Sequence, residues 1–328
     1  MAGPGRALAE QFVERHAALD PCGATFEGIP GHDHELTDYS PDGTAERLAH
    51  TRATLRELST LAPAHDAERV AAESLRRFLE TDADLTESGE DVRALRVIGS
   101  PVSEIRLCFD LMPRVTEHDW ETIVARVALV PQAISGFTES LQAGMRDGLF
   151  AAPRQAQACA TQADTFAGIA DGATPFFAGL GDELAATTVG TEALRSRLDE
   201  VAARATAAYA SLGRFLVEEY LPVTDAPDAV GAERYRRDSF DLRDAPPKSL
   251  RILHGQIVGH PADDRHGAAG FGLPGQDDEQ VRSQRRKLFR DRFFRALAER
   301  QHRDDRGDAD QDTEDGKESA HLMRPHRA

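Results

Sequence analysis

The stretch TEHDWETIVARVALVPQAISGFTESLQAGM, residues 116–145, decides the fold class of this chain. Thr116 is a good helix N-cap, and Glu117 and Asp119 place negative charge in the first turn, where the helix dipole favours it. The apolar positions that follow recur about every 3.6 residues, which is the period of one helix face. The pattern predicts helix, with Pro131 either kinking the helix or splitting it in two. The apolar positions are Trp120, Ile123, Val124, Val127, Ile134, Phe137, Leu141 and Met145.

Much of the rest of the first 220 residues repeats apolar side chains at the same helical spacing. Helices are predicted near residues 8–19, 40–61, 66–79 and 100–112. No segment shows the sustained alternation of apolar and polar residues that marks a half-buried strand. We therefore predict an all-α fold, a long-helix array or bundle. The inward-facing positions of the four segments are Leu8, Phe12, Val13, His16 and Leu19; Leu48, Thr51, Leu55, Leu58 and Leu61; Val70, Leu75, Phe78 and Leu79; and Val102, Ile105, Phe109 and Met112.

Capping residues predict where three of these helices begin. Ser40 precedes Pro41, which gives an N-cap followed by proline at the first helical position. Gly99-Ser100-Pro101 has the same form, and Asp66 can cap the helix that lies between them. The first helix ends at Asp20-Pro21-Cys22-Gly23, and a loop is expected to follow it.

A long helix is predicted from Thr191 to Leu221, closed by Pro222. Its apolar positions step alternately by four and three residues, which makes a heptad seam. We interpret it as a core helix of a bundle, because the seam is short and partly alanine; the alternative is a dimerisation coil. The seam residues are Leu194, Leu198, Val201, Ala205, Ala208, Leu212 and Phe215.

The composition of the chain changes near Tyr235. Residues 1–236 hold 21 basic and 38 acidic residues and no lysine, whereas residues 237–328 hold 18 of each sign. The formal net charge of −17 therefore arises entirely in the first segment. We predict a helical domain over 1–236 and a low-order, charge-balanced tail over 237–328 that is largely disordered. One hypothesis for the change is a shift of reading frame near Phe240.

Composition also limits the classes of function. No apolar run approaches the roughly 18 residues that a spanning helix needs, and no apolar signal segment opens the chain, so a cytoplasmic protein without a membrane span is expected. The acidic main domain repels phosphates, which excludes nucleic acid as its partner. The three cysteines, Cys22, Cys108 and Cys159, are odd in number and far apart. That pattern fits a reducing compartment and small, buried thiols rather than a disulfide framework.

Candidate chemistry gathers in the loop GIPGHDHE, residues 28–35. His32, Asp33 and His34, followed by Glu35, are potential ligands or proton carriers. Neighbouring loop residues alone rarely complete a tetrahedral metal site, so the alternative is a solvated polar loop. Asp110 is either a buried acid with a defined partner or, as is commoner for a lone Asp, an exposed side chain.

The tail carries two further patterns. His254, His260 and His266 stand six residues apart, whereas helical metal ligands stand three or four apart, as in His-Glu-x-x-His, a motif that this chain lacks. Residues 282–295 interleave basic and apolar side chains, which indicates either a basic amphipathic binding segment or an incidental, weakly structured one. From these patterns we assign no catalytic residue and no metal ligand.

Six strings stand in this order within residues 7–240: Ala24–His34, Leu36–Gly43, Ser100–Arg106, Phe109–Pro113, Glu117–Trp120 and Asp228–Tyr235. Together they resemble the N-terminal half of the bacterial family catalogued as domain of unknown function 885. The resemblance implies an all-helical, zinc-peptidase-like enzyme of a little under twice this length, acting on a peptide-like substrate.

The family's zinc ligands lie in its C-terminal half, in a His-Glu-x-x-Pro-Gly-His helix and a later Glu-Gly-Trp-Ala stretch. Neither has a counterpart in this chain, so no catalytic role is carried over and zinc is expected only in a complete family member. The resemblance thus implies the truncated, N-terminal, cleft-forming part of a metallopeptidase-like protein, inactive as a hydrolase by itself. In that architecture His32, Asp33 and His34 are the residues expected to approach the cleft.

Two alternatives remain open at this point. The first is a stand-alone helical interaction protein whose basic amphipathic tail segment binds a partner. The second, which the spacing argues against, is a zinc enzyme that uses His254, His260 and His266. The sequence leaves the oligomeric state, the substrate and the presence of enzymatic activity undecided.

Overall fold

The computed structural model describes residues 4–63, 65–170, 172–232 and 234. These residues form ten α-helices, several short 3₁₀ turns and one π-helical turn, and among them there is no β-strand. The all-α prediction is confirmed for this part of the chain. The predicted tail, residues 237–328, lies outside the described residues, as do the histidine series and the basic amphipathic segment.

The longest connections between helices are residues 28–40, between α2 and α3, and residues 88–100, between α4 and α5, which include a 3₁₀ turn. The bounds of the helices are α1 Pro4–Leu19, α2 Pro21–Glu27, α3 Pro41–Thr60, α4 Asp66–Glu87, α5 Pro101–Leu107, α6 Glu117–Val127, α7 Val130–Arg146, α8 Pro153–Phe166, α9 Phe176–Ala185 and α10 Glu192–Phe215. The 3₁₀ turns are η1 Asp91–Arg93, η2 Cys108–Leu111 and η4 Leu221–Val223, and the π turn is η3 Leu216–Tyr220.

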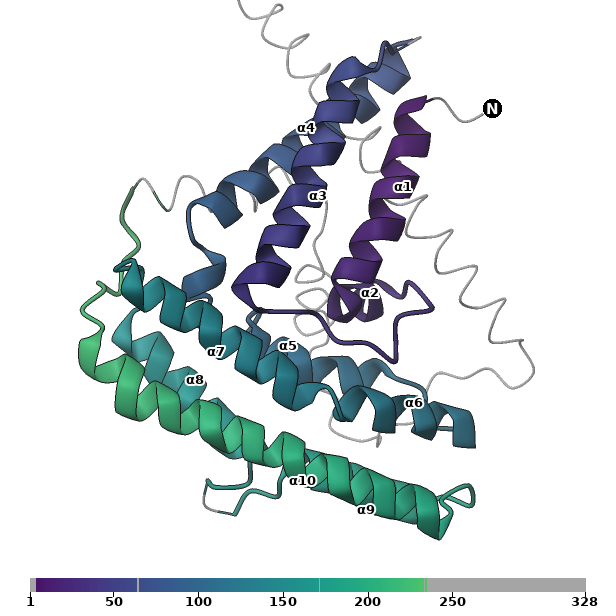
Figure 1. Cartoon of the computed structure of the whole chain (residues 1–328), viewed down its shortest axis with the longest axis vertical. Helices are drawn as coiled ribbons and strands as arrows, with labels where there is room; N and C mark the ends of the chain where they lie inside the picture. The colour runs from purple at the N-terminus through teal and green to yellow at the C-terminus, as the bar shows by residue number, and fades with distance from the viewer. Residues whose placement is uncertain (1–3, 64, 171, 233, 235–328) are drawn as a thin grey trace, which may run out of the picture.

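The helices pack in two groups (Figure 1). Helices α1, α3 and α4 pack on one another around a small apolar cluster. Beneath them, α5 to α10 form a second layer around a much larger core. Helix α2 and the loop after it lie between the two groups. The small cluster consists of Leu8, Phe12, Leu58, Leu75 and Leu79. The largest buried apolar side chains of the second layer are Trp120, Tyr209, Tyr220, Phe109, Phe137 and Phe177.

Helix α10 is the central packing element of the second layer. It contacts α6, α7, α8 and α9 of the same chain, so the prediction of a core helix is confirmed. Six of its seven seam residues are buried, and Ala208 is half-buried. The α-helix ends at Phe215 rather than at Leu221, because the last turn is π-helical.

The predicted N-terminus of α6 is confirmed in detail. Asp119 N donates to Thr116 Oγ1 at 3.2 Å, and Thr116 N donates to Asp119 Oδ2 at 2.8 Å, so the two residues cap each other. The helix ends at Val127 and α7 begins at Val130, so Pro131 follows a split rather than kinking a continuous helix.

Besides the C-terminal end of α10, three local predictions were wrong. The segment after Asp20 is helix α2 and not a loop, because Asp20 Oδ1 accepts from Gly23 N at 3.1 Å and Pro21 supplies the first helical residue. The N-cap of α4 is His65, whose backbone is extended, while Asp66 lies in the first turn. Val13 faces solvent with 37% of its surface exposed.

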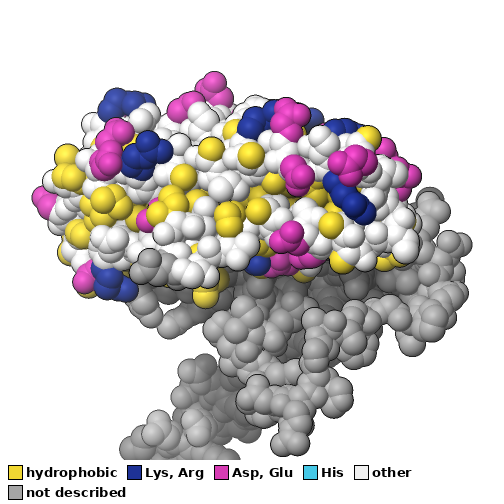
Figure 2. Space-filling model, turned by 90° about the horizontal axis from the view of Figure 1, so that it is seen from below, with side chains coloured by type: hydrophobic (Ala, Val, Ile, Leu, Met, Phe, Trp, Pro, Cys, Tyr) yellow, Lys and Arg dark blue, Asp and Glu magenta, His cyan; other side chains and the backbone are white. Residues whose placement is uncertain are grey.

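The outer face of the second layer is chemically mixed. Figure 2 shows this face, which lies at the bottom of Figure 1, with hydrophobic side chains interspersed among acidic and basic ones. No charge of a single sign dominates the face. Across the described residues, no helix combines the length and apolar character required for a membrane crossing.

Candidate functional site

Two glycines shape the loop between α2 and α3. Gly28 closes α2 in the left-handed conformation, with φ of 70°, and Ile29 N donates to Ala24 O at 2.8 Å. Gly31 follows with φ of 103°, a value that residues with a side chain rarely adopt. The chain therefore turns twice within four residues and presents His32, Asp33 and His34 outside the end of α2.

Asp33 is held in place by the protein interior. Thr25 Oγ1 donates to Asp33 Oδ1 at 3.0 Å, and the fully buried guanidinium of Arg126 lies 3.8 Å from the same oxygen. Arg126 also donates to Thr25 Oγ1 at 2.8 Å and to Pro21 O at 3.0 Å. A charged group without exposed surface thus fixes the loop to α6, and Asp33 keeps 25% of its side chain exposed.

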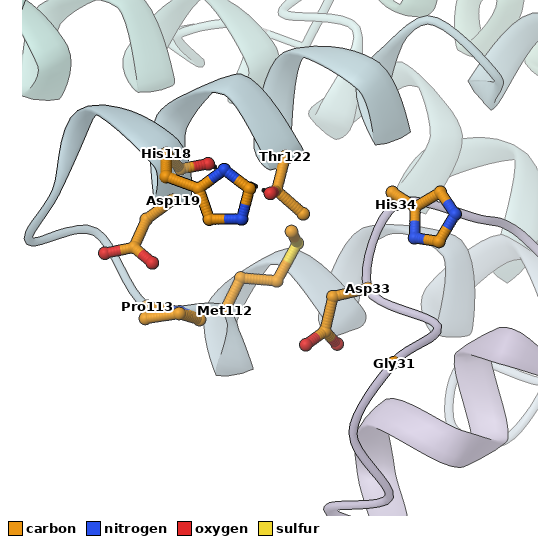
Figure 3. A pocket seen from close by; sticks show the side chains of 8 residues that line it. All are labelled: Gly31, Asp33, His34, Met112, Pro113, His118, Asp119 and Thr122. Atoms are coloured by element: carbon orange, nitrogen blue, oxygen red, sulfur yellow. Dashed lines mark hydrogen bonds between the residues drawn. The ribbon is translucent and has the colours of Figure 1, made fainter. Parts of the chain in front are cut away.

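An open pocket of ≈ 260 Å³ lies beside this loop (Figure 3). The loop forms one side, and the start of α6 together with the two residues after η2 forms the other. The pocket combines an apolar part, from a thioether and a proline ring, with two imidazoles and two carboxylates. Its lining residues are Gly31, Asp33, His34, Met112, Pro113, His118, Asp119 and Thr122.

The polar groups of the pocket differ in how free they are to meet a ligand. Asp119 is used as the capping partner of Thr116, and Thr122 donates to His118 O at 2.9 Å. The imidazoles of His34 and His118 are 60% and 87% exposed, and each has a carboxylate nearby: His34 Nε2 lies 3.8 Å from Glu35 Oε1, and His118 Nδ1 lies 3.9 Å from Glu121 Oε2. The side chains most accessible to a ligand are therefore the two imidazoles. Asp33 is less accessible, because one of its oxygens is engaged by Thr25 and Arg126.

The structure separates the three residues that the sequence grouped. Asp33 and His34 line the pocket, whereas His32 turns to Glu35, with 3.1 Å between Nδ1 and Oε2. Sequence reasoning missed Met112, His118 and the other residues of the far wall as site residues. Met112 and His118 lie in two of the strings that carry the family resemblance, but those strings do not indicate which residues meet in the folded chain.

The one hydroxyl among the residues that line the pocket is not paired with a base. Thr122 Oγ1 donates to the backbone oxygen of His118 rather than to an imidazole, and no serine, cysteine or lysine is among the lining residues. Where the structure describes the chain, no three His, Cys, Asp or Glu side chains are grouped so that they could hold a metal ion. The pocket offers a thioether and a proline ring for apolar contact, and two exposed imidazoles that can donate or accept hydrogen bonds.

Asp110, the other acid singled out in the sequence, lies outside the pocket lining. Its side chain is 36% exposed and pairs with Arg106, one turn earlier in α5. The Arg106 guanidinium lies 4.3 Å from the centre of the Phe176 ring in α9, a cation–π arrangement. Asp110 therefore supports a structural contact between α5 and α9.

A second polar group lies inside the protein behind α2. Asp20 Oδ1 accepts from Thr37 Oγ1 at 2.5 Å, and the Tyr39 hydroxyl donates to Glu104 Oε2 at 3.3 Å. Burial raises the pKa of Glu104 to about 7, and the negative charges of Asp20 and Cys22 add to that effect. Burial likewise raises the pKa of Tyr39.

The described residues form an all-helical fold with the open pocket described above, lined by both polar and apolar side chains. Residues 21–242 match the family described as "Bacterial protein of unknown function (DUF885)". The match covers more than half of the chain, so the chain belongs to this family. None of the curated proteins matches it significantly.

Two solved structures share the fold. One is described as a "putative lipoprotein of unknown function" from Shewanella oneidensis, with a TM-score of 0.57, 15% identity, and coverage of 79% of this chain and 46% of the other. The second, described as a "putative lipoprotein" from Colwellia psychrerythraea, has a TM-score of 0.57, 15% identity, and coverage of 78% and 49%. The chain thus spans about half the length of these two proteins.

Proposed function

We propose that this chain is the N-terminal, cleft-forming helical part of a metallopeptidase-like protein and that its pocket holds part of a peptide-like substrate. The observation that supports this most is the coverage: most of this chain corresponds to less than half of each of the two structural neighbours. Ligand sites often lie in clefts between two parts of a protein. In a longer protein that contains this fold, the open side of the pocket can face such a cleft, and the residues around the pocket would form one of its walls.

In this proposal the pocket binds and orients, and does not cleave. Met112 and Pro113 offer an apolar contact for a substrate side chain, and the imidazoles of His34 and His118 can exchange hydrogen bonds with peptide amides. The described residues do not fit a zinc site, since no ligand group of three is present among them. Zinc is proposed only for complete relatives, and the chain as given is proposed to be inactive.

Imidazole signals in ¹H–¹³C spectra of the purified chain test the binding role. Adding short peptides should shift the His34 and His118 signals and leave that of His65 unchanged, because His65 caps α4 away from the pocket. A His34→Ala, His118→Ala double variant should weaken the binding, and a His65→Asn variant, which keeps an N-cap, should not. Spectra without any peptide-dependent shift at millimolar concentration would reject the proposed pocket role.

Zinc content and peptide hydrolysis test the second half of the proposal. Elemental analysis should find substoichiometric zinc, and peptide incubated with the chain should stay intact. One tightly held zinc per chain with peptidase activity, both lost on His254→Ala, would contradict the proposal and support the histidine series of residues 254–266 instead.

The alternative of a stand-alone interaction protein rests on residues 282–295, outside the described residues. A chain shortened after Phe240 distinguishes peptide binding in the pocket from partner binding by residues 282–295. Unchanged peptide binding in the shortened chain supports the pocket, whereas loss of a partner that the full chain binds supports the alternative.

A further inference from the structure

The pocket presents a carboxylate from each of its two walls. Asp33 comes from the loop after α2, and Asp119 comes from the first turn of α6 on the other wall (Figure 3). The thioether chain of Met112 lies between them in this view. Among the described residues that line the pocket, none is arginine or lysine. The pocket therefore combines an apolar surface with an acidic group on either side.

Each of these carboxylates keeps one oxygen available to a ligand. Thr25 and the Arg126 guanidinium both approach Asp33 through Oδ1. Asp119 receives the two backbone N–H groups that it caps through Oδ2, at 3.0 and 2.8 Å. Within the part of the chain that the structure describes, Asp33 Oδ2 and Asp119 Oδ1 have no hydrogen-bond partner. Both oxygens can therefore accept from a ligand while the structural contacts stay in place.

Further acidic side chains lie next to the pocket. Glu35 and Glu121 stand 3.8 and 3.9 Å from the imidazoles of His34 and His118, respectively. With the two lining carboxylates they make a group of four negative charges. Even protonation of both imidazoles would leave this group with an excess of negative charge.

Two arginines near the pocket do not reverse this balance. Arg126 has no exposed surface and lies on the interior side of Asp33, so a ligand meets the carboxylate and not the guanidinium. Arg114, in the segment between η2 and α6, is paired with Glu183 of α9. The acidic character of the whole domain acts in the same direction, because the formal charge of −17 arises in residues 1–236.

We propose that the pocket selects a basic side chain, lysine or arginine, of a peptide-like substrate. This inference rests on the proposed function, since it names the kind of residue that the bound peptide presents to the pocket. The aliphatic stem of that side chain lies on Met112 and Pro113, as such stems do on apolar surface. Its cationic head donates to the available oxygens of Asp33 and Asp119.

A matched series of peptides tests the selection on the full chain. Peptides of the form Ala-Ala-X-Ala, acetylated and amidated so that they carry no terminal charge, isolate the effect of the side chain X. The imidazole signals of His34 and His118 report binding and give the Kd. Lysine and arginine at X should bind about fivefold more tightly than norleucine, an unbranched aliphatic chain without charge, and glutamate should bind most weakly. Raising the salt to about 0.5 M NaCl should reduce the advantage of lysine over norleucine.

Variants assign the selection to the two carboxylates. Asp33→Asn and Asp119→Asn should each reduce the preference for lysine over norleucine to about twofold, with norleucine binding unchanged. Glu117→Gln is the matched control, because it removes one charge from the same turn of α6 but lies outside the pocket lining. The wild-type peptide series decides the case by itself if an asparagine variant fails to fold.

The outcomes separate this inference from the peptide-binding proposal on which it rests. Equal affinity for lysine and norleucine peptides, with clear shifts of both imidazole signals, would overturn the selection and leave peptide binding in place. Tighter binding of the glutamate peptide would overturn it as well. Signals that no peptide shifts at millimolar concentration would reject peptide binding in the pocket, and the selection together with it.

Discussion

The guanidinium of Arg126, which has no exposed surface, donates a 2.8 Å hydrogen bond to the hydroxyl of Thr25, 101 positions earlier in the chain. Through this contact α6 holds the C-terminal end of α2, and Thr25 in turn donates to Asp33. The position of the pocket loop is therefore set from inside the protein.

Replacing Arg126 with methionine should lower the free energy of unfolding by about 3 kcal/mol, because Pro21 O and the Asp33 carboxylate lose a buried charged partner. Urea unfolding followed by circular dichroism measures the change. Arg52→Met is the control: Arg52 pairs with Glu87 in an exposed setting and should cost less than about 1 kcal/mol. Equal losses in the two variants would show that Arg126 has no special structural role.

Glu104 should make the domain less stable as pH rises. Its folded-state pKa is raised from 4.5 to about 7, so the folded protein holds a proton that the unfolded chain releases. The protonated Glu104 therefore contributes to the free energy of unfolding fully below pH 4.5, and this contribution is lost as pH rises through 7. Glu104→Gln should remove this loss, which is on the order of 3 kcal/mol, so the variant becomes more stable than wild type above pH 7.

Denaturant unfolding of wild type and Glu104→Gln between pH 4 and 8 gives the difference directly. The exposed Glu57 in α3 provides the control, since Glu57→Gln should leave the shape of the pH profile unchanged. Parallel wild-type and Glu104→Gln profiles would mean that Glu104 titrates like an exposed carboxylate.

Two glycines within helices should respond to alanine in opposite directions. A Cβ at Gly144 in α7 would meet the carbonyl oxygen of Val92 and lie 2.9 Å from that of Leu149, so Gly144→Ala should destabilise by about 2 kcal/mol. A Cβ at Gly179 in α9 meets nothing within 4 Å. Gly179→Ala should therefore stabilise by about 0.5–1 kcal/mol through helix propensity. Melting temperatures that fall in both variants would contradict this reasoning.

The two helix groups should differ in local stability. The cluster between α1, α3 and α4 has five buried apolar residues, whereas α7 and α10 lie in the extended core of the second layer. Fewer buried contacts permit opening at lower free energy, so amides of α1 and α4 should exchange hydrogen faster than those of α7 and α10. Hydrogen exchange read by mass spectrometry tests this, and uniform protection across all four helices would refute it.

Local signals were enough to predict much of the fold. The capping pair Thr116 and Asp119 acts within four residues, and the apolar period of α10 reports a buried face directly. Proline at 131 marks a helix boundary because it lacks an N–H, whatever packs nearby. These features depend on residues that are close in the sequence, so the sequence alone is enough to predict them.

The site was less accessible to sequence reasoning because long-range packing creates it. Asp33 and His34 were recognised as polar residues in one loop, but nothing local indicates that His118 faces them across a pocket. An arginine in a helix is usually expected to face solvent, but Arg126 is fully buried and donates to the backbone of Pro21 in α2, more than 100 positions earlier in the chain.

Because of the π turn at Leu216–Tyr220, the position of the chain after it depends on the number of residues in the turn more than on their side chains. A π turn holds one residue more than an α-helical turn, and one residue of helix rotates the chain by about 100°. The extra residue brings the Tyr220 hydroxyl to Ala151 N, from which it accepts a 2.7 Å hydrogen bond. Deleting a single residue here would turn the tyrosine away and swing the following segment, with its Asp228 contact to Arg154, to another side of the helix. In related sequences this helix end should therefore tolerate many substitutions and few single-residue gaps.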